Sequence, residues 1–520
     1  MSRVAKSKER LSKVSTNEGL LPSHQAVSIS GMDSHIVINL RPSAASTALS
    51  NGDDLLFDLE PRNGFNIKDI VLRLRLTCAT AAVTTVPGPY LIDRIRIEAN
   101  KGSGDTLQTI YPEQIIWMYA NMNQHEQEFY RNNGHFHLEE CKKWYRFTKP
   151  LPLQVGDVKD VYIPIPGAFW HNQAIHLQQI KEDIRFRIEL NSDFVVSGTA
   201  TNVTVSDVSL LIRQDDQTSS ESADWVSQGQ SRPHVYNYLD VIKVTDNQTN
   251  QAVSTESKYD LDNVVGKVPF ILCVHKPASS PAASDESLYN YYEIGDASTW
   301  DLKSPNNESL FGRGNGLRTD YLRLQWMNHV GRKPIHGMYM IPFTNDTDVS
   351  DAGMMDNYFP FVGDKETLSV TYTSAPTSEV HTFTTSDTAD SGSYKMFYGG
   401  HYSAPIAYNG NAAAIKAAVE LMPPIRDRHI TVTASGAATS TFTLTYDAGS
   451  FRVSDDFKGE PMRLIESSLS DGTVGATFAE TVSTYGKDGF VDQSYSVELF
   501  VFYFKRLMVS KDGRLSCKTL

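Results

Sequence analysis

The segment HFHLEEC brings His135, His137 and Cys141 close together in the sequence. Imidazole and thiolate groups are common zinc ligands, so these side chains could form part of a tetrahedral site. No fourth ligand is visible nearby, and Glu139 and Glu140 have the character of solvated residues. We therefore interpret the segment as ordinary structure and predict no bound metal.

The segment FGRGNG, with Gly312, Gly314 and Gly316, is the second pattern that suggests a chemistry. A dinucleotide-binding loop requires a strand before its glycines and a helix after them. No helix-forming stretch is evident after Gly316, so the sequence favours a flexible loop. The chain also lacks a G-x-S-x-G elbow and an H-E-x-x-H motif, which are signatures of hydrolases and metalloproteases.

Two groups of aromatic residues could stack on sugars or bases. They are Tyr289, Tyr291 and Tyr292, and Phe500, Phe502, Tyr503 and Phe504. Aromatic side chains in strands more often belong to a core or an interface, and we interpret them so. We predict no catalytic residue, no cofactor and no enzymatic activity. The enzymatic alternative, a carbohydrate-active β-sandwich, would need two carboxylates facing each other in a cleft.

The composition is that of a folded protein, with 520 residues of which 40% are hydrophobic and 10% aromatic. One hydrophobic core stops growing at about 250–300 residues, so several domains are expected. Cys78, Cys141, Cys273 and Cys517 are far apart and require neither disulfides nor zinc. No signal peptide and no apolar run long enough to cross a bilayer is evident. These features predict a soluble protein made in the cytoplasm.

Charge is distributed unevenly along the chain. The formal net charge is −13, and a net negative chain does not by itself bind nucleic acid. Residues 1–13, however, contain only one acid, Glu9, against the basic residues Arg3, Lys6, Lys8, Arg10 and Lys13. A basic arm at 1–22 can contact nucleic-acid phosphates or lipid headgroups. A solvated, disordered terminus is the alternative.

Most periodic segments are short, rich in β-branched or aromatic residues, and bounded by turn residues. Residues 70–76 alternate Ile and Leu with Arg73 and Arg75, and residues 91–98 alternate similarly. A period of two is typical of half-buried strands. Further strands are predicted at 27–40, 159–165, 184–190, 204–213, 235–245, 268–275, 320–327, 335–343 and 495–509. Many strands at this spacing favour sandwiches or barrels.

Helical signal is sparse, and one polar stretch divides the strands into two blocks. Residues 112–131 begin with Pro112 and Glu113, which suit a first helical turn, and predict one helix. The polar stretch 213–233 contains a predicted linker at 219–233. The simplest organisation is a first β-domain at 23–218, followed by a second at 234–374 and 489–520.

Residues 375–488 are rich in Thr, Ser, Ala and Gly and interrupt the second block. A helix capped by Asn409 or Asn411 is predicted before Pro423, followed by strands at 429–433 and 441–446. We interpret this block as an inserted small β-rich domain, because an insertion in a surface loop costs little loop-closure entropy.

Three stretches resemble the double jelly-roll major capsid proteins of tailless, membrane-containing phages and large eukaryotic DNA viruses. They are 90–121 with YLIDRIRIEAN before a helix, 161–190 with VYIPIPGAFW and later IRFRIEL, and 495–520 with YSVELFVFYFKRLMVSKDGRLSCKTL. The resemblance covers roughly 1–363 and 489–520. It implies an all-β fold of two tandem jelly rolls, each an eight-stranded sandwich, with few helices. The Pro-Ser-Gly and Asn-x-Ser-Arg turn usual in large-virus members is absent after 335–343, so no viral lineage is assigned.

The block at 379–488 has a resemblance of its own. Its run from Ala404 to Pro423, APIAYNGNAAAIKAAVELMP, is similar to a small β-rich module of phage structural proteins and bacterial surface proteins. This similarity implies a virion or cell-surface context and no catalysis.

The resemblance implies a subunit of a virion shell, made in the host cytoplasm. Two similar sandwiches per chain would give six similar blocks in a homotrimer, a pseudo-hexameric capsomer that tiles an icosahedral capsid. Implied partners are neighbouring trimers, minor capsid and penton proteins, an internal membrane or genome through the N-terminal arm, and a host receptor through a tower domain at 375–488. The alternative is a receptor- or glycan-binding spike or surface adhesin made of β-sandwiches, although the missing signal peptide disfavours a secreted adhesin.

Overall fold

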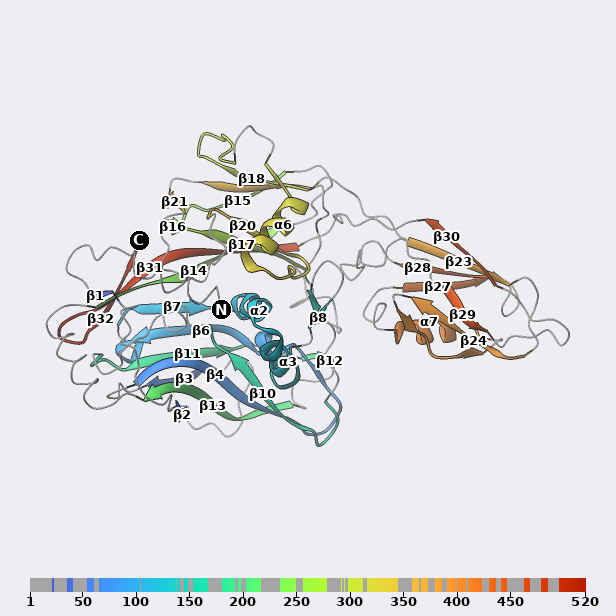
Figure 1. The fold of residues 1–520 in the computed structure, drawn as a ribbon, viewed down its shortest axis with the longest axis horizontal. Helices are drawn as coiled ribbons and strands as arrows, with labels where there is room; N and C mark the ends of the chain where they lie inside the picture. The colour runs from blue at the N-terminus through green and yellow to red at the C-terminus, as the bar shows by residue number, and fades with distance from the viewer. Residues whose placement is uncertain are drawn as a thin grey trace, which may run out of the picture.

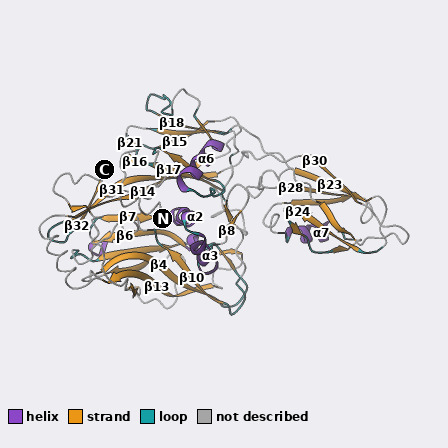
Figure 2. Ribbon diagram, in the orientation of Figure 1, coloured by secondary structure: helices purple, strands orange, loops and turns teal. Residues whose placement is uncertain are grey.

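The structure is a computed structural model that describes most, but not all, of the chain. The described residues are 21–22, 35–40, 54–59, 65–102, 104–136, 138–140, 145–147, 153–166, 180–191, 195–197, 203–216, 234–248, 256–277, 291, 294, 298–311, 316–344, 358–363, 366–372, 379–385, 391–398, 400–407, 410–422, 430–435, 441–446, 463–467, 478–484 and 495–520. Strands dominate them and helices are few, as Figure 2 shows. The all-β prediction is confirmed.

The first sandwich consists of two four-stranded sheets, with strand orders β10-β4-β13-β2 and β3-β11-β6-β7 (Figure 1). Its strands are β2 (His35–Leu40), β3 (Asp54–Leu59), β4 (Phe65–Cys78), β6 (Ile92–Ala99), β7 (Thr106–Ile110), β10 (Val158–Pro164), β11 (Ile184–Leu190) and β13 (Val203–Asp216). Every connection except β6 to β7 crosses from one sheet to the other, which is the topology of a jelly roll.

Alternation along β4 explains how the first sandwich closes. Leu72, Leu74 and Leu76 are at most 1% exposed and face the core, whereas Arg73 and Arg75 point outward and form ion pairs with Asp160 of β10. Because apolar residues lie on one face of the sheet and charged residues on the other, only the apolar face packs into the core. The half-buried strand predicted at 70–76 is confirmed.

The second sandwich repeats the strand order of the first, with sheets β14-β31-β17-β20 and β15-β22-β18-β19. Its strands are β14 (His234–Gln248), β15 (Glu256–Asp260), β17 (Phe270–Pro277), β18 (Thr299–Lys303), β19 (Leu317–Arg318), β20 (Met338–Pro342), β22 (Thr367–Thr371) and β31 (Tyr495–Val509). Taken in chain order, these eight strands occupy the same sheet positions as the eight strands of the first sandwich. Two tandem jelly rolls, as predicted, therefore account for the main body of the chain.

Shorter elements complete the two sandwiches. β1 (Leu21–Pro22) pairs parallel to β14, so the predicted N-terminal arm ends against the second jelly roll, and β32 (Leu515–Thr519) pairs with β31. The others are β5 (Thr84–Thr85) with β12 (Val195–Ser197), β8 (Leu138–Glu140) with β9 (Tyr145–Phe147), β16 (Val265–Val268) with β21 (Phe359–Val362), and the 3-10 turns η1 (Gly88–Leu91) and η2 (Asn100–Gly102).

The single helix predicted at 112–131 is wrong, because the structure has two helices there, α2 (Pro112–Asn121) and α3 (Gln124–Asn133). Met122 has an extended ψ of 155°, which ends α2. The Asn123 side chain then accepts a hydrogen bond from the backbone N–H of Glu126 at 3.0 Å, and the Glu126 carboxylate accepts one from the backbone N–H of Asn123. This capping box is written in the sequence as Asn-x-x-Glu, a signal for a new helix start.

The strand predicted at 320–327 is also wrong, because those residues belong to helix α6 (Thr319–Val330). The buried residues Thr319, Leu322, Trp326 and His329 follow a helical period, although the short run YLRLQW also fits a period of two. Short apolar runs are ambiguous in this way. Gly331, with φ of 71°, ends the helix in the left-handed conformation that glycine adopts without strain.

The strands between β22 and β31 form separate sheets that lie beside the two sandwiches in Figure 1. They are β23 (Glu379–Thr385), β24 (Ser393–Tyr398), β25 (His401–Tyr402), β26 (Ile406–Ala407), β27 (Ile430–Ser435), β28 (Thr441–Tyr446), β29 (Arg463–Ser467) and β30 (Phe478–Thr484). Helix α7 (Ala412–Glu420) is capped by Asn411, whose side chain accepts from the N–H of Ala414 at 3.0 Å. The cap prediction is confirmed for Asn411. The domain limits at 375 and 488, and the linker at 219–233, lie outside the described residues and stay predictions.

Candidate functional site: the contact between the two jelly rolls

The segment HFHLEEC, whose residue types could form part of a metal site but which we interpret as ordinary structure, is described in part. His135 is 1% exposed. Its Nε2 lies 3.0 Å from Thr85 Oγ1, and its Nδ1 lies 2.7 Å from Lys159 Nζ, whose pKa is lowered by burial. His137 and Cys141 lie outside the described residues. In the described stretches of chain, no three His, Cys, Asp or Glu residues are grouped so that they could hold a metal ion.

The expectation that no helix follows Gly316 is wrong, since α6 begins at Thr319. Gly316 has a φ of 62°, and β19 after it pairs antiparallel with β18. A dinucleotide loop needs a parallel βαβ unit, so the setting differs from that of the fingerprint. Gly312 and Gly314 lie outside the described residues.

The aromatic residues named from the sequence form core and interface, as predicted. Tyr291, Phe500, Phe502, Tyr503 and Phe504 are all buried, at 8% exposure or less. Tyr289 and Tyr292 lie outside the described residues, as do the basic residues of the N-terminal arm. The role of that arm stays a prediction.

An aromatic contact joins the first jelly roll to the second. Trp117 of α2 lies with its ring centroid 5.5 Å from that of Phe270 and 5.9 Å from that of Phe502, in β17 and β31. Phe270 and Phe502 stack on each other at 4.3 Å. One continuous apolar cluster therefore runs from the interior of the first sandwich, through α2, to the outer face of the β14-β31-β17-β20 sheet.

A buried group of charges lies beside this aromatic contact. Lys276 Nζ, at the end of β17, forms ion pairs with Glu113 of α2 and, at 2.6 Å, with Glu498 Oε2 of β31. Lys243 of β14 binds Glu498 Oε1 at 2.8 Å. The side chains of Lys276, Glu113 and Glu498 are 13%, 2% and 11% exposed. So little water reaches these ions that each depends on its partners.

Electrostatic attraction keeps this cluster ionised despite its burial. Burial disfavours the charge on Lys276, but Glu113 and Glu498 outweigh it and raise the pKa of the ammonium group. Burial likewise opposes the charge on Glu498, but Lys276 and Lys243 hold the pKa of that carboxyl below its usual value. Lys276 and Glu498 are thus charged at neutral pH. The cluster links α2 to three strands of the second jelly roll.

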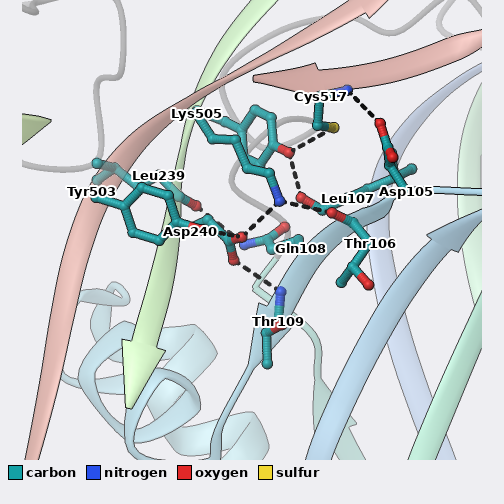
Figure 3. Close-up of polar contacts among 11 residues, drawn as sticks. Asp105, Thr106, Leu107, Gln108, Thr109, Leu239, Asp240, Tyr503, Lys505 and Cys517 are labelled. Atoms are coloured by element: carbon teal, nitrogen blue, oxygen red, sulfur yellow. Dashed lines mark hydrogen bonds and ion pairs between the residues drawn. The ribbon is translucent and has the colours of Figure 1, made fainter. Parts of the chain in front are cut away.

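A second polar contact covers the edge strand β7 of the first jelly roll (Figure 3). Asp240 of β14 accepts a hydrogen bond from the backbone N–H of Thr109 at 2.9 Å. Lys505 of β31 donates to the carbonyl of Thr106 at 2.7 Å, and Tyr238 donates to the carbonyl of Leu107. An uncovered sheet edge is a site for unwanted strand pairing. Here side chains of the second sandwich satisfy the backbone of that edge.

Asp240 is the centre of this contact. Its Oδ2 also accepts from Tyr503 Oη and Lys505 Nζ, each at 3.0 Å, and the residue is 3% exposed. Burial, and then the Asp240 carboxylate, raise the pKa of Tyr503 well above its ordinary value. Its hydroxyl therefore stays protonated and donates to Asp240.

Sequence reasoning missed both polar contacts, although it contained signals for them. Glu498 interrupts the apolar run of β31, and Asp240 interrupts that of β14 between Leu239 and Val241. A charge inside an otherwise apolar strand is costly unless it is paired. This signal marks Glu498 and Asp240 but does not identify their partners, because Lys276 and Thr109 are remote from them in the sequence.

The contact is of a kind that holds two domains of one chain together. Domains of one chain usually move relative to each other unless their interface is large and apolar. Here the apolar cluster is continuous and is flanked on both sides by buried ions with fixed partners. These contacts hold two β-sandwiches in place and do not bring catalytic side chains together.

Two sandwiches of identical jelly-roll order, held side by side in one chain, define the double jelly-roll fold. Among solved structures, the chain is similar to the PBCV-1 protein VP54, as fitted into a reconstruction of the virophage Sputnik. The TM-score is 0.53 and the identity 12%, over 95% of this chain and 99% of that chain. A quasi-atomic model of the PBCV-1 virus capsid matches with a TM-score of 0.53 and 11% identity, over the same shares of the two chains. At this identity the likeness establishes the fold.

No protein-family model matches the sequence, and no curated protein matches it. The resemblance found in the sequence is confirmed by the fold of the two jelly rolls, which these solved structures share. The similarity of 379–488 to a phage and surface module stays a prediction. In the part of the chain that the structure describes, no helix is both long and apolar enough to span a bilayer.

Proposed function

We propose that this protein is a major capsid protein that forms homotrimers, and that each trimer is a pseudo-hexameric capsomer of an icosahedral virion shell. The observation that carries the proposal is the repetition of one jelly-roll order in two sandwiches that are locked together. Three rigid subunits of this kind supply six similar blocks, which can close a ring with few distinct contacts. One of the solved structures with this fold is a quasi-atomic model of the PBCV-1 virus capsid.

The role is structural and not catalytic. The buried charged groups described above all have ion-pair or hydrogen-bond partners within the chain, and this leaves them unsuited to proton transfer with a substrate. Neighbouring trimers, minor capsid proteins and penton proteins are the proposed partners, in a shell assembled from protein made in the host cytoplasm.

Size measurement of the purified chain tests the proposal. Light scattering after gel filtration is expected to give three times the chain mass, and electron images are expected to show particles with six lobes. A chain that remains monomeric at high concentration would count decisively against a coat subunit and in favour of a receptor-binding spike or adhesin.

The basic arm, with Arg3, Lys6, Lys8, Arg10 and Lys13, is proposed to face the interior and bind membrane or genome. Deleting residues 1–13 should leave the trimer and its unfolding midpoint unchanged, because these residues precede β1. Particle assembly or binding to anionic vesicles should fall, since each basic residue contributes about 1 kcal/mol near an anionic surface. A variant that replaces the five basic residues with Gln is the matched control for length. Normal assembly and vesicle binding of both variants would exclude this role.

The block at 375–488 is proposed to be an inserted tower domain that contacts a host receptor. Its strands pair only with one another among the described strands, so replacing it with a short Gly-Ser linker should preserve the trimer. Shortening the loop changes closure entropy only slightly, by about 0.6 kcal/mol for each halving. Binding of the full-length trimer to host cells or glycans should be lost in the variant. Unchanged binding would place the receptor contact elsewhere, and loss of the trimer would show that the block is not a separate domain.

A further inference from the structure

The internal repeat predicts where one subunit contacts the next, provided that the proposed trimer forms. In both jelly rolls a helix follows the fifth strand in chain order, which is an edge strand of its sheet. These helices are α2 after β7 and α6 after β19. The two helices can be aligned from their first residues, Pro112 and Thr319. This alignment matches Ile115 with Leu322 and Tyr119 with Trp326, and all four residues are buried. In that alignment Glu113 corresponds to Asp320, and Trp117 to Leu324.

The two helices differ in what covers their outward faces. The second jelly roll covers α2, where Glu113 binds Lys276 and Trp117 packs on Phe270 and Phe502. Nothing in the described part of the chain covers the corresponding face of α6. Tyr321, Leu324 and Met327, three residues apart, are 45%, 47% and 43% exposed. Three apolar side chains on one helix face form a patch, unlike isolated exposed residues.

The sheets also correspond, and this locates a matching surface on the first jelly roll. β10 ends in Ile-Pro, with Pro164 opposite Val71 of β4, and β20 ends in Ile-Pro, with Pro342 opposite Phe270 of β17. Phe270 therefore corresponds to Val71. Phe502 is opposite Phe270, and Leu211 of β13 is opposite Val71. The pair that receives Trp117 thus corresponds to Val71 and Leu211.

Val71 and Leu211 are half-buried on the outer face of the β10-β4-β13-β2 sheet. Arg75 lies on the same outward row, where Asp160 holds it at 2.8 Å. On this face of β4, Arg75 is the neighbour of the position that corresponds to Lys276. An apolar side chain at Leu324 would therefore meet an apolar pair, as Trp117 does within one chain. The charged groups on the two surfaces already have partners, because Arg318 binds Asp320 and both Asp160 and Asp207 bind Arg75.

We infer that the exposed face of α6 packs on the outer face of β4 and β13 of a second copy of this chain, with Leu324 seated on Val71 and Leu211. The contact inside one subunit is then repeated between subunits. A head-to-tail contact that repeats in this way forms a closed ring when the rotation between neighbours allows closure. The six jelly rolls of a trimer would alternate between internal and external versions of the same contact.

Charge substitutions test the inference. Leu324→Glu and Leu211→Lys should each raise the trimer dissociation constant about tenfold or more, because a buried unpaired charge at an interface centre is costly. The double variant places Glu against Lys at each contact and should recover the trimer. Leu421→Glu, at a site that is 70% exposed next to α7, is the matched control and should have no effect. Unfolding midpoints close to that of the wild type will show that the variants fold.

Cross-linking gives an independent readout. A variant with Leu324→Cys and Leu211→Cys should form disulfide-linked dimers and trimers on oxidation, and each single substitution should not. If the wild type is a trimer but Leu324→Glu is equally trimeric and no cross-link forms, the inference is wrong and the proposed function stands. If the wild type itself is monomeric, both are wrong.

Discussion

Replacing Lys276 with Met is expected to lower the free energy of unfolding by about 3–5 kcal/mol, because it leaves a buried carboxylate without its partner. Glu113 is 2% exposed and has Lys276 as its ion-pair partner, whereas Glu498 keeps Lys243. The Met side chain is similar in length, so the loss of charge rather than of volume is measured. Urea unfolding at fixed protein concentration, followed by fluorescence, gives the change.

Two further variants show that the effect comes from the stranded charge. Lys258→Met removes an exposed ion pair of 3.9 Å, and should change stability by less than about 1 kcal/mol. Adding Glu113→Gln to Lys276→Met should recover part of the loss, because it removes the unpaired charge. If Lys276→Met were no less stable than Lys258→Met, the buried cluster would not hold the two jelly rolls together.

The second large effect is expected for Asp240→Ala, again a loss of about 3–5 kcal/mol. This substitution leaves Lys505, which is 12% exposed, without its carboxylate. It also removes the acceptors for Tyr503 and for the backbone N–H of Thr109. Hydrogen exchange of the peptide that contains β7 should accelerate, because its edge is no longer covered.

Asp240→Asn separates charge from hydrogen bonding, since the amide oxygen can still accept from Thr109. Its loss should fall between those of Asp240→Ala and the control Glu420→Ala. The control removes an exposed pair of 3.6 Å between Lys416 and Glu420 on α7, which is worth about 0.3–0.5 kcal/mol. Unchanged exchange of β7 in Asp240→Ala would refute the proposed covering of that edge.

Sequence patterns predicted the strands well where one side of the strand faces a core. β4 alternates Leu with Arg at residues 72–76, and β28 begins and ends at the residues predicted, 441 and 446. They failed at α6, where the six-residue run YLRLQW fits both a helical and a strand period, and at Met122, where a capping box divides a helix. Local patterns cannot distinguish these cases, because the tertiary contacts of Leu322 and Trp326 decide them.

The contact between the jelly rolls was beyond sequence reasoning for a different reason. Glu498 and Asp240 could be marked as unusual, but their partners lie far away in the chain, and pairing depends on how two sandwiches meet. Two tandem jelly rolls were expected from the resemblance, but the matching of individual residues was not, since the two halves share topology without a residue-level repeat. Only the pairing of strands reveals that Val71 and Phe270 occupy matching positions.

The position of β31 has a consequence for synthesis. This strand lies between β14 and β17 in its sheet, yet it follows the block at 375–488 in the chain. The first jelly roll can fold while the ribosome is still translating the rest, whereas β14 and β17 must wait for their shared neighbour. β31 also supplies Phe502, Glu498 and Lys505 to the contact with the first jelly roll. A prematurely terminated chain therefore lacks both the central strand of this sheet and the contacts that join the two sandwiches.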